Sequence, residues 1–265
     1  MRRLLLPCLL ILACSRPEAP RPATPKRIIT LAPNVTEIVY ALGSGDAVVG
    51  TDDFSDFPPA AKSKPKVGGM QPSLEKLAAL KPDMVIATTN GNHPSLAPAL
   101  AALHVPLFVL KTERLDDIPR EMHRLGTALA SPRRDAAVAE LRRAIEAQRR
   151  TRAKKPRVLF AVWADPLYVA GRKTFTDDLL ILTGAENAVP VDGWPQYSLE
   201  SLAANPPDLI LYPDREVSRA QVAKLLELVH AEAVPVDENL FTRPGPRVGE
   251  AAARLNAILD GRRAN

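Results

Sequence analysis

A fifteen-residue segment occurs twice in this chain, and this repeat constrains the fold more than any other feature of the sequence. SLEKLAALKPDMVIA at 73–87 returns as SLESLAANPPDLILY at 198–212, with eight of fifteen positions identical and no gap. The copies lie 125 residues apart, whereas solenoid repeats have periods of about 20–50 residues. A weaker similarity pairs 36–43 with 176–184. The sequence therefore predicts two copies of one structural unit.

Each half of the chain alternates β-rich segments with helical ones. Strands that alternate with helices predict βαβ units and parallel sheets. One helix is expected to begin at Asn34-Val-Thr-Glu37, which has the spacing of a capping box. We therefore predict an α/β fold of two similar three-layer lobes with parallel sheets.

A single long helix is expected to join the two lobes. Ser131-Pro132 is a favourable N-cap and N1 pair, and no glycine or further proline interrupts the following run. A connecting helix over 131–155 divides the chain into an N-terminal lobe at 27–130 and a C-terminal lobe at 156–265. Because one rigid helix permits only a small opening, we expect a clamp that is nearly preformed.

The first thirteen residues have the pattern of an export signal. Arg2 and Arg3 precede an apolar run that is too short to span a bilayer. The run ends in ILAC, which resembles the lipobox of bacterial lipoproteins and implies cleavage of a 1–13 signal peptide and lipidation of Cys14. An ordinary secretory signal with a chance cysteine is the alternative. The proline-rich stretch 14–26 then reads as a tether, which predicts a periplasmic or other extracytoplasmic protein anchored to a membrane.

Composition argues against several other classes of protein. With Cys8 in the signal and Cys14 lipidated, the mature chain has no cysteine for a disulfide or a zinc cluster. The four histidines lack HExxH or HxxxH spacing, and no nucleophile elbow or phosphate loop occurs. The net charge of +5 is spread along the chain, which argues against a nucleic-acid partner. We expect a monomer that is not an enzyme and holds no metal or cofactor.

Aromatic and amide side chains follow several of the expected strands. Ligand sites in parallel sheets lie beyond the carboxyl ends of the strands. Aromatic residues make up only 5% of the chain, so their concentration here favours a large, partly flat, uncharged ligand. The alternative is that each ring fills the core of its own lobe, although Trp194 lies in a Gly- and Pro-rich stretch. The candidate side chains are Phe54, Asn92, Tyr168, Trp194 and Phe241.

Glu75 and Glu200 occupy matching places in the two repeats, each in the first turn of its helix. An acid there interacts favourably with the helix dipole, by some tenths of a kcal/mol. The functional interpretation is a pair of acids, one in each lobe, that dock on a symmetric basic partner.

Several segments together resemble the helical-backbone (class III) solute-binding proteins of ABC importers, and most closely their cobalamin-binding (BtuF-like) branch. The segments are RIITLAPNVTEIVYALG, DDFSDFPPAAK, SLEKLAALKPDMVIA, DPLYVAGRKTFTDDLLILTGAENAV, GWPQYSLESLAANPPDLIL and FTRPGPR. The resemblance implies two α/β lobes with the ligand in the cleft. It also implies that Glu75 and Glu200 meet arginines on the two permease subunits. Ligand contacts are implied for Phe54, Tyr168, Trp194 and the loop Asn239, Leu240, Phe241, Thr242 and Arg243.

Four positions depart from the best-known members of this branch. Met70, a candidate ligand contact, and Thr88 stand where those members have tryptophan, which thins the aromatic wall of the first lobe. Thr183 and Asn256 stand where those members have a disulfide pair, which agrees with the absence of mature cysteines.

The resemblance predicts capture of cobalamin or a related corrinoid and its delivery to an ABC permease dimer. Haem is an alternative that requires an axial ligand, with Tyr168, Tyr197 and His93 as candidates. A ferric siderophore would require cleft arginines, for which Arg172 and Arg243 are available. A tetrapyrrole-acting enzyme would need a histidine paired with a carboxylate, and a purely structural lipoprotein would leave the aromatic loops unexplained.

Overall fold

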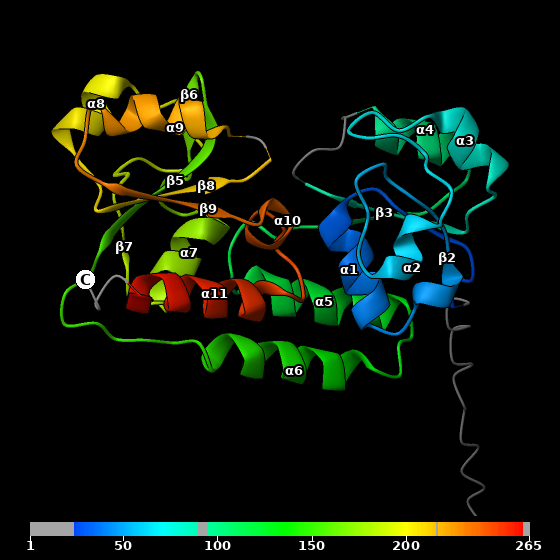
Figure 1. Cartoon of the computed structure of the whole chain (residues 1–265). Coiled ribbons are helices and arrows are strands. Elements are labelled where there is room, and N and C mark those ends of the chain that lie inside the picture. Colours follow the sequence, from blue (N-terminus) through cyan, green and yellow to red (C-terminus); the bar gives the residue numbers. More distant parts are fainter. Residues whose placement is uncertain (1–23, 90–94, 216, 262–265) are drawn as a thin grey trace, which may run out of the picture.

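The structure is a computed structural model that describes residues 24–89, 95–215 and 217–261. It contains two sheets in two lobes that lie side by side (Figure 1). The predicted two-lobed α/β fold is therefore confirmed. The expected signal peptide, Cys14, Asn92 and His93 lie outside the described residues. Within those residues no helix is long and apolar enough to cross a bilayer.

The N-terminal lobe is built on a wholly parallel sheet covered on both faces. Its strands lie in the order β2 (Val48–Thr51), β1 (Ile28–Thr30), β3 (Met84–Thr88) and β4 (Leu107–Leu110). Its helical segments are α1 (Pro33–Ala41), η1 (Gly45–Ala47), α2 (Pro59–Lys62), α3 (Leu74–Ala79), α4 (Leu96–Ala102) and α5 (Asp117–Ala128). Because side chains alternate along a strand, Ile28 packs with α1 and α5, whereas Ile29 packs with α3 and α4. This arrangement gives three layers.

The C-terminal lobe repeats this plan with one antiparallel addition. Its strands lie in the order β6 (Leu167–Val169), β5 (Arg157–Ala164), β8 (Leu209–Pro213) and β9 (Glu232–Val236), and β7 (Glu186–Asn187) also pairs with β5. Among the strands of this lobe that the structure describes, β5 and β6 pair antiparallel and the other pairs are parallel. Its helices are α7 (Phe175–Leu182), α8 (Leu199–Ala204), α9 (Arg219–Leu226), α10 (Glu238–Phe241) and α11 (Val248–Gly261). Phe160 packs with α7 and α11, and Leu159 packs with α8 and α9.

The connecting helix is shorter than the sequence predicts. Helix α6 spans Arg134–Glu146, about 20 Å at 1.5 Å per residue, so the expected extent of 131–155 is wrong. The chain leaves the helix because tertiary hydrogen bonds replace helical ones. The Arg150 amide donates to the Leu182 carbonyl at 2.9 Å, and the Asn256 side chain donates to the Gln148 carbonyl at 2.8 Å.

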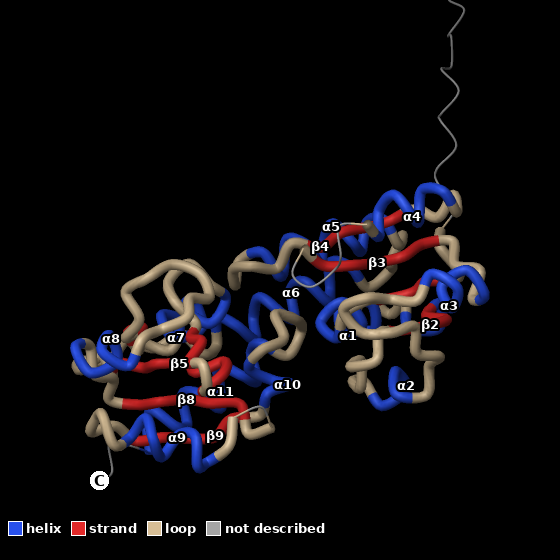
Figure 2. The backbone as a smooth tube through the Cα atoms, turned by 90° about the horizontal axis from the view of Figure 1, so that it is seen from above, coloured by secondary structure: helices blue, strands red, loops and turns tan. Residues whose placement is uncertain are grey.

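One apolar core extends beneath both lobes. It includes Ile28 and Ile118 from the N-terminal lobe, Leu141 from α6, and Phe160 and Leu255 from the C-terminal lobe. Helix α6 packs against α5 and α11, and the three helices run along the same side of the molecule (Figure 1). In the view from above, both sheets lie over this helical base (Figure 2). Because the lobes share a close-packed interior at their base, any relative motion is limited to a small opening at the strand ends.

Candidate functional site

A cavity of about 790 Å³ lies between the lobes at the carboxyl ends of the strands. Segments that follow strands of both sheets supply its walls, as expected for parallel α/β structures. The N-terminal lobe contributes Ala32, Pro33, Asn34, Asp53, Phe54, Asp56, Met70, Thr88, Thr112 and Glu113. The C-terminal lobe contributes Phe175, Trp194, Arg215, Glu238, Asn239, Thr242, Arg243 and Pro244.

Three large apolar side chains that line this cavity are exposed to solvent. Phe54, Met70 and Trp194 are 61%, 68% and 52% exposed, and all three were predicted as ligand contacts. The Phe54 ring packs on the backbone of Gly69, where a Cβ would lie 3.0 Å from the ring. Gly193 has a φ of +78°, which favours glycine and turns the chain immediately before Trp194. The cavity therefore presents apolar surface from both lobes.

Other predicted contacts lie elsewhere. Leu240 and Phe241 are 2% and 1% exposed, and Phe241 stacks on Phe160 with ring centroids 6.5 Å apart. Their assignment as ligand contacts is wrong for this structure, because the helical turn of α10 directs them into the core. Tyr168 is exposed on β6, outside the cavity lining.

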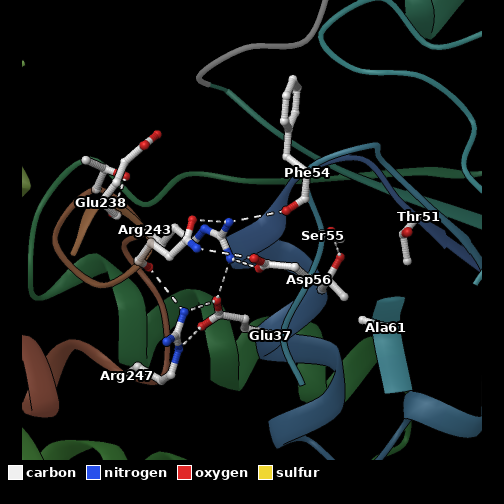
Figure 3. Close-up of polar contacts among 12 residues, drawn as sticks. Glu37, Thr51, Phe54, Ser55, Asp56, Ala61, Glu238, Arg243 and Arg247 are labelled. Atoms are coloured by element: carbon white, nitrogen blue, oxygen red, sulfur yellow. Dashed lines mark hydrogen bonds and ion pairs between the residues drawn. The ribbon is translucent and has the colours of Figure 1, made fainter. Parts of the chain in front are cut away.

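A network of charged side chains joins the lobes at one edge of the cavity (Figure 3). Arg243 donates from Nη1 to Asp56 Oδ1 at 2.6 Å and to Glu37 Oε1 at 3.3 Å. Its Nη2 donates to the Asn239 side chain at 2.6 Å and to the Phe54 carbonyl at 3.2 Å. Partial burial acts to raise the pKa of Asp56, but the hydrogen bond and charge of Arg243 outweigh it and lower that pKa.

A second arginine completes the network. Arg247 donates to both carboxylate oxygens of Glu37, at 2.9 and 2.7 Å, and its guanidinium lies 4.2 Å from the centroid of the Phe57 ring. The hydrogen bond to Glu37 raises the pKa of Arg247, although burial opposes it. This bidentate geometry suits a pair removed from water.

The capping box predicted at Asn34 and Glu37 does not form. Helix α1 begins at Pro33, and its N-cap residue Ala32 makes no side-chain cap. The Asn34 side chain instead donates to the Thr112 hydroxyl at 3.2 Å and to the Pro244 carbonyl at 3.3 Å. Both side chains serve contacts to distant segments, because the start of α1 lies at the lobe boundary.

The loop that carries Phe54 is fixed within its own lobe by a buried polar cluster. The Phe54 amide donates to Asp52 at 2.9 Å, and the Ser55 hydroxyl bonds with Asp52 and with Thr36. Thr36 also bonds with Thr30 on β1 at 2.6 Å. Burial raises the pKa of Asp52, and the hydrogen bonds from Ser55 and Phe54 oppose this shift. The aromatic residue thus stands on a rigid support.

The charge of the cavity was not predicted from the sequence. Four acids line it, against two arginines. Arg215 is exposed and makes no side-chain hydrogen bond or ion pair with any other described residue. The acids are Asp53, Asp56, Glu113 and Glu238. Alternation of strands and loops could not reveal this balance, because the acids come from three separate segments of the chain.

Of the described residues proposed for the alternative ligands, Arg243 lines the cavity, whereas Tyr168, Tyr197 and Arg172 do not. Tyr197 is buried and its hydroxyl donates to the Ser201 carbonyl at 3.3 Å. Arg172 lines a separate cavity of about 520 Å³ beside the end of α6. Over the described ranges, no tyrosine or histidine lines the cavity between the lobes, and no cluster of three or more metal-ligating side chains occurs.

Glu75 and Glu200 lie at corresponding places on the two lobes. Both are exposed in the first turns of α3 and α8, and both helices lie at the top of the molecule as drawn in Figure 1. Ser73 and Ser198 cap these helices, each accepting from a backbone amide three residues on. The pKa of Glu200 is lowered by a backbone hydrogen bond and by Ser198. Neither acid lines the cavity.

Thr183 and Asn256 are bridged by one buried arginine. Arg152 is 5% exposed, and it donates to the Thr183 carbonyl at 2.8 Å and to the Asn256 side chain at 2.9 Å. Hydrogen bonds through Arg152 therefore link Thr183 with Asn256.

Two α/β lobes on a shared helical base, with a partly apolar cavity at their strand ends, define a protein built to hold a solute. The model of a family described as periplasmic binding protein matches residues 28–233. The chain belongs to this family.

Similar proteins of known name agree with this assignment. The chain is 33% identical over 249 residues to the vitamin B12-binding protein of Pectobacterium carotovorum, covering 89% of both chains. Among solved structures it resembles the periplasmic haem-binding protein RhuT of Roseiflexus sp. RS-1, with a TM-score of 0.79 and 28% identity over 88% of this chain and 97% of that one. It also resembles the vitamin B12-binding protein BtuF of Vibrio cholerae, with a TM-score of 0.75 and 26% identity over 89% and 97%.

Proposed function

We propose that this protein captures cobalamin or a related corrinoid in the cavity between its lobes and delivers it to an ABC permease. The observation that carries the proposal is the apolar surface of Phe54, Met70 and Trp194, exposed from both lobes into a cavity of about 790 Å³. A macrocycle with a broad apolar face would cover these side chains, and polar groups of the loops would bind its amide fringe.

The charge of the cavity favours a corrinoid over haem. Haem carries two propionates, and an acid-rich wall disfavours an anionic ligand. A corrin ring carries neutral amides at its edge, whose N–H groups the carboxylates of Asp53, Glu113 and Glu238 can accept. Fold similarity to the haem-binding RhuT supports haem as the second candidate. A haem protein of this kind would bring a tyrosine, histidine or other axial ligand to the iron.

The proposal also covers anchoring to a membrane and docking on the permease. Lipidation of Cys14 would hold the protein at a membrane surface outside the cytoplasm. Glu75 and Glu200, exposed on the same side of the two lobes, would pair with basic residues of a two-fold related permease. The named relative is a vitamin B12-binding protein. In line with it, we propose a binding protein without catalytic activity.

Calorimetric titration of the purified protein with cyanocobalamin, haemin and a ferric siderophore tests the proposal. We expect one-to-one binding of cyanocobalamin and at least tenfold weaker binding of the two competitors. Haemin spectra report the alternative directly, because an axial tyrosine or histidine changes the absorption of the iron. Tight binding of haemin without a response to cyanocobalamin would refute the proposal.

A further inference from the structure

The arginine predicted to contact the solute has its terminal nitrogens committed to the protein itself. A guanidinium has five N–H donors, of which four lie on the two terminal nitrogens. In Arg243 these four serve Asp56, Glu37, Asn239 and the Phe54 carbonyl. The side chain is only 11% exposed. No terminal N–H remains for a carboxylate or phosphate of a ligand.

Three of these four partners lie in the other lobe. Glu37 belongs to α1, and Phe54 and Asp56 belong to the loop after β2, whereas Arg243 follows α10. Asn239 adds a further link, because its amide donates to Asp56 at 3.2 Å. The guanidinium therefore spans the lobe boundary beside the cavity (Figure 3).

We propose that Arg243 is a positioning residue that fixes the width of the cleft and the place of Phe54. The Phe54 carbonyl accepts from Arg243, and its amide is held by Asp52, so the backbone is fixed from both lobes. Its ring points away from the ion cluster in Figure 3 and lines the cavity. The link to solute affinity rests on the proposed function, whereas the link to cleft width does not.

Planarity makes arginine the residue suited to this place. A lysine has the same charge, but its ammonium is a single point with three donors. A single ammonium cannot donate at once to the two carboxylates, the amide and the carbonyl that surround the planar guanidinium of Arg243. Arg243→Lys is therefore expected to lose most of the clamp, although it conserves the charge.

The surrounding contacts allow the clamp to be removed without unfolding the protein. Glu37 stays neutralised by its bidentate pair with Arg247. The Asp56 side chain is 36% exposed, so water can solvate it. The common core beneath the lobes is untouched. Arg243→Gln should thus open the cleft rather than denature the chain.

Distance measurement between spin labels tests the proposal without any ligand. The full chain, with Cys8 and Cys14 replaced by serine, carries labels at Leu103→Cys and Leu228→Cys, two exposed sites in different lobes. In the parent we expect one narrow distance distribution. Arg243→Gln and Arg243→Lys should broaden it toward longer distances.

Arg215→Gln is the matched control. It removes the other cavity arginine, which makes no such links among the described residues, and it should retain the parent distribution. Asp56→Asn should reproduce the broadening, and adding Arg243→Gln to it should broaden the distribution little further. If the released cleft has the binding geometry about a tenth of the time, the apparent Kd for cyanocobalamin rises about tenfold.

Parent-like distributions in Arg243→Gln, Arg243→Lys and Asp56→Asn would overturn the proposal. So would a distribution in Arg215→Gln as broad as in Arg243→Gln. Circular dichroism of each variant verifies the fold, and Asp56→Asn alone decides the outcome if Arg243→Gln does not fold. Failure of cyanocobalamin to bind the parent would count against the proposed function only, because the distance result is independent of it.

Discussion

Truncation of Phe54 should weaken solute binding while leaving the fold almost unchanged. Its side chain is 61% exposed and lines the cavity. If a solute covers that fraction of about 200 Å² of aromatic surface, about 120 Å² leaves water, which contributes about 3 kcal/mol at about 25 cal/mol per Å². A flat macrocycle covers one face of the ring. We therefore expect about half this value in Phe54→Ala, or about a tenfold rise in Kd.

Phe57 provides a matched control in the same loop. It is 41% exposed, it lies outside the cavity lining, and its ring packs beneath the guanidinium of Arg247 at 4.2 Å. Phe57→Ala should lower the free energy of unfolding by about 1 kcal/mol through the lost cation–π contact. Phe54→Ala should change that free energy by less than about 0.5 kcal/mol, as expected for an exposed side chain.

Two assays separate these outcomes. Calorimetry with cyanocobalamin gives Kd, and urea denaturation monitored by circular dichroism gives the free energy of unfolding. A Kd for Phe54→Ala within twofold of the parent would refute the assignment of this ring to the ligand wall. A larger loss of affinity in Phe57→Ala than in Phe54→Ala would refute it equally.

Three further predictions address the core, the docking acids and pH. Phe241→Ala should lower the free energy of unfolding by about 3–5 kcal/mol by leaving a cavity in the core, measured by urea denaturation; a loss below about 1 kcal/mol would contradict its buried place. Glu75→Ala combined with Glu200→Ala should leave cyanocobalamin affinity unchanged and abolish vitamin uptake in a transport assay; normal uptake would show that these acids only stabilise their helices. The lowered pKa of Asp56 means that its ion pair stabilises the folded state at pH above the ordinary aspartate value and is lost as pH falls through the lowered pKa. The distance between the spin labels should therefore lengthen only at pH values below the ordinary pKa of aspartate. Asp56→Asn should abolish this pH-dependent transition.

The sequence by itself determined the repeated architecture. The fifteen-residue repeat and the alternation of strands and helices are local signals that can be recognised without knowledge of the tertiary contacts. They predicted two parallel α/β lobes, a cavity at the strand ends, and the exposed places of Phe54 and Trp194. The exact extent of α6 was not predictable, because tertiary hydrogen bonds of Arg150 and Gln148 end it early.

Only the tertiary structure decided which side chains face the cavity and which serve the fold. Phe241 and Trp194 are both aromatic residues in loop-rich segments, yet one fills the core and the other lines the cavity. Glu37 resembles a helix cap in the sequence, but it is buried against Arg247 from a segment 210 residues away. Arg243 resembles a ligand contact, but its terminal donors are taken by the opposite lobe. The physical reason is common to all of these residues: burial and charge pairing depend on segments brought together by folding, which no local pattern records.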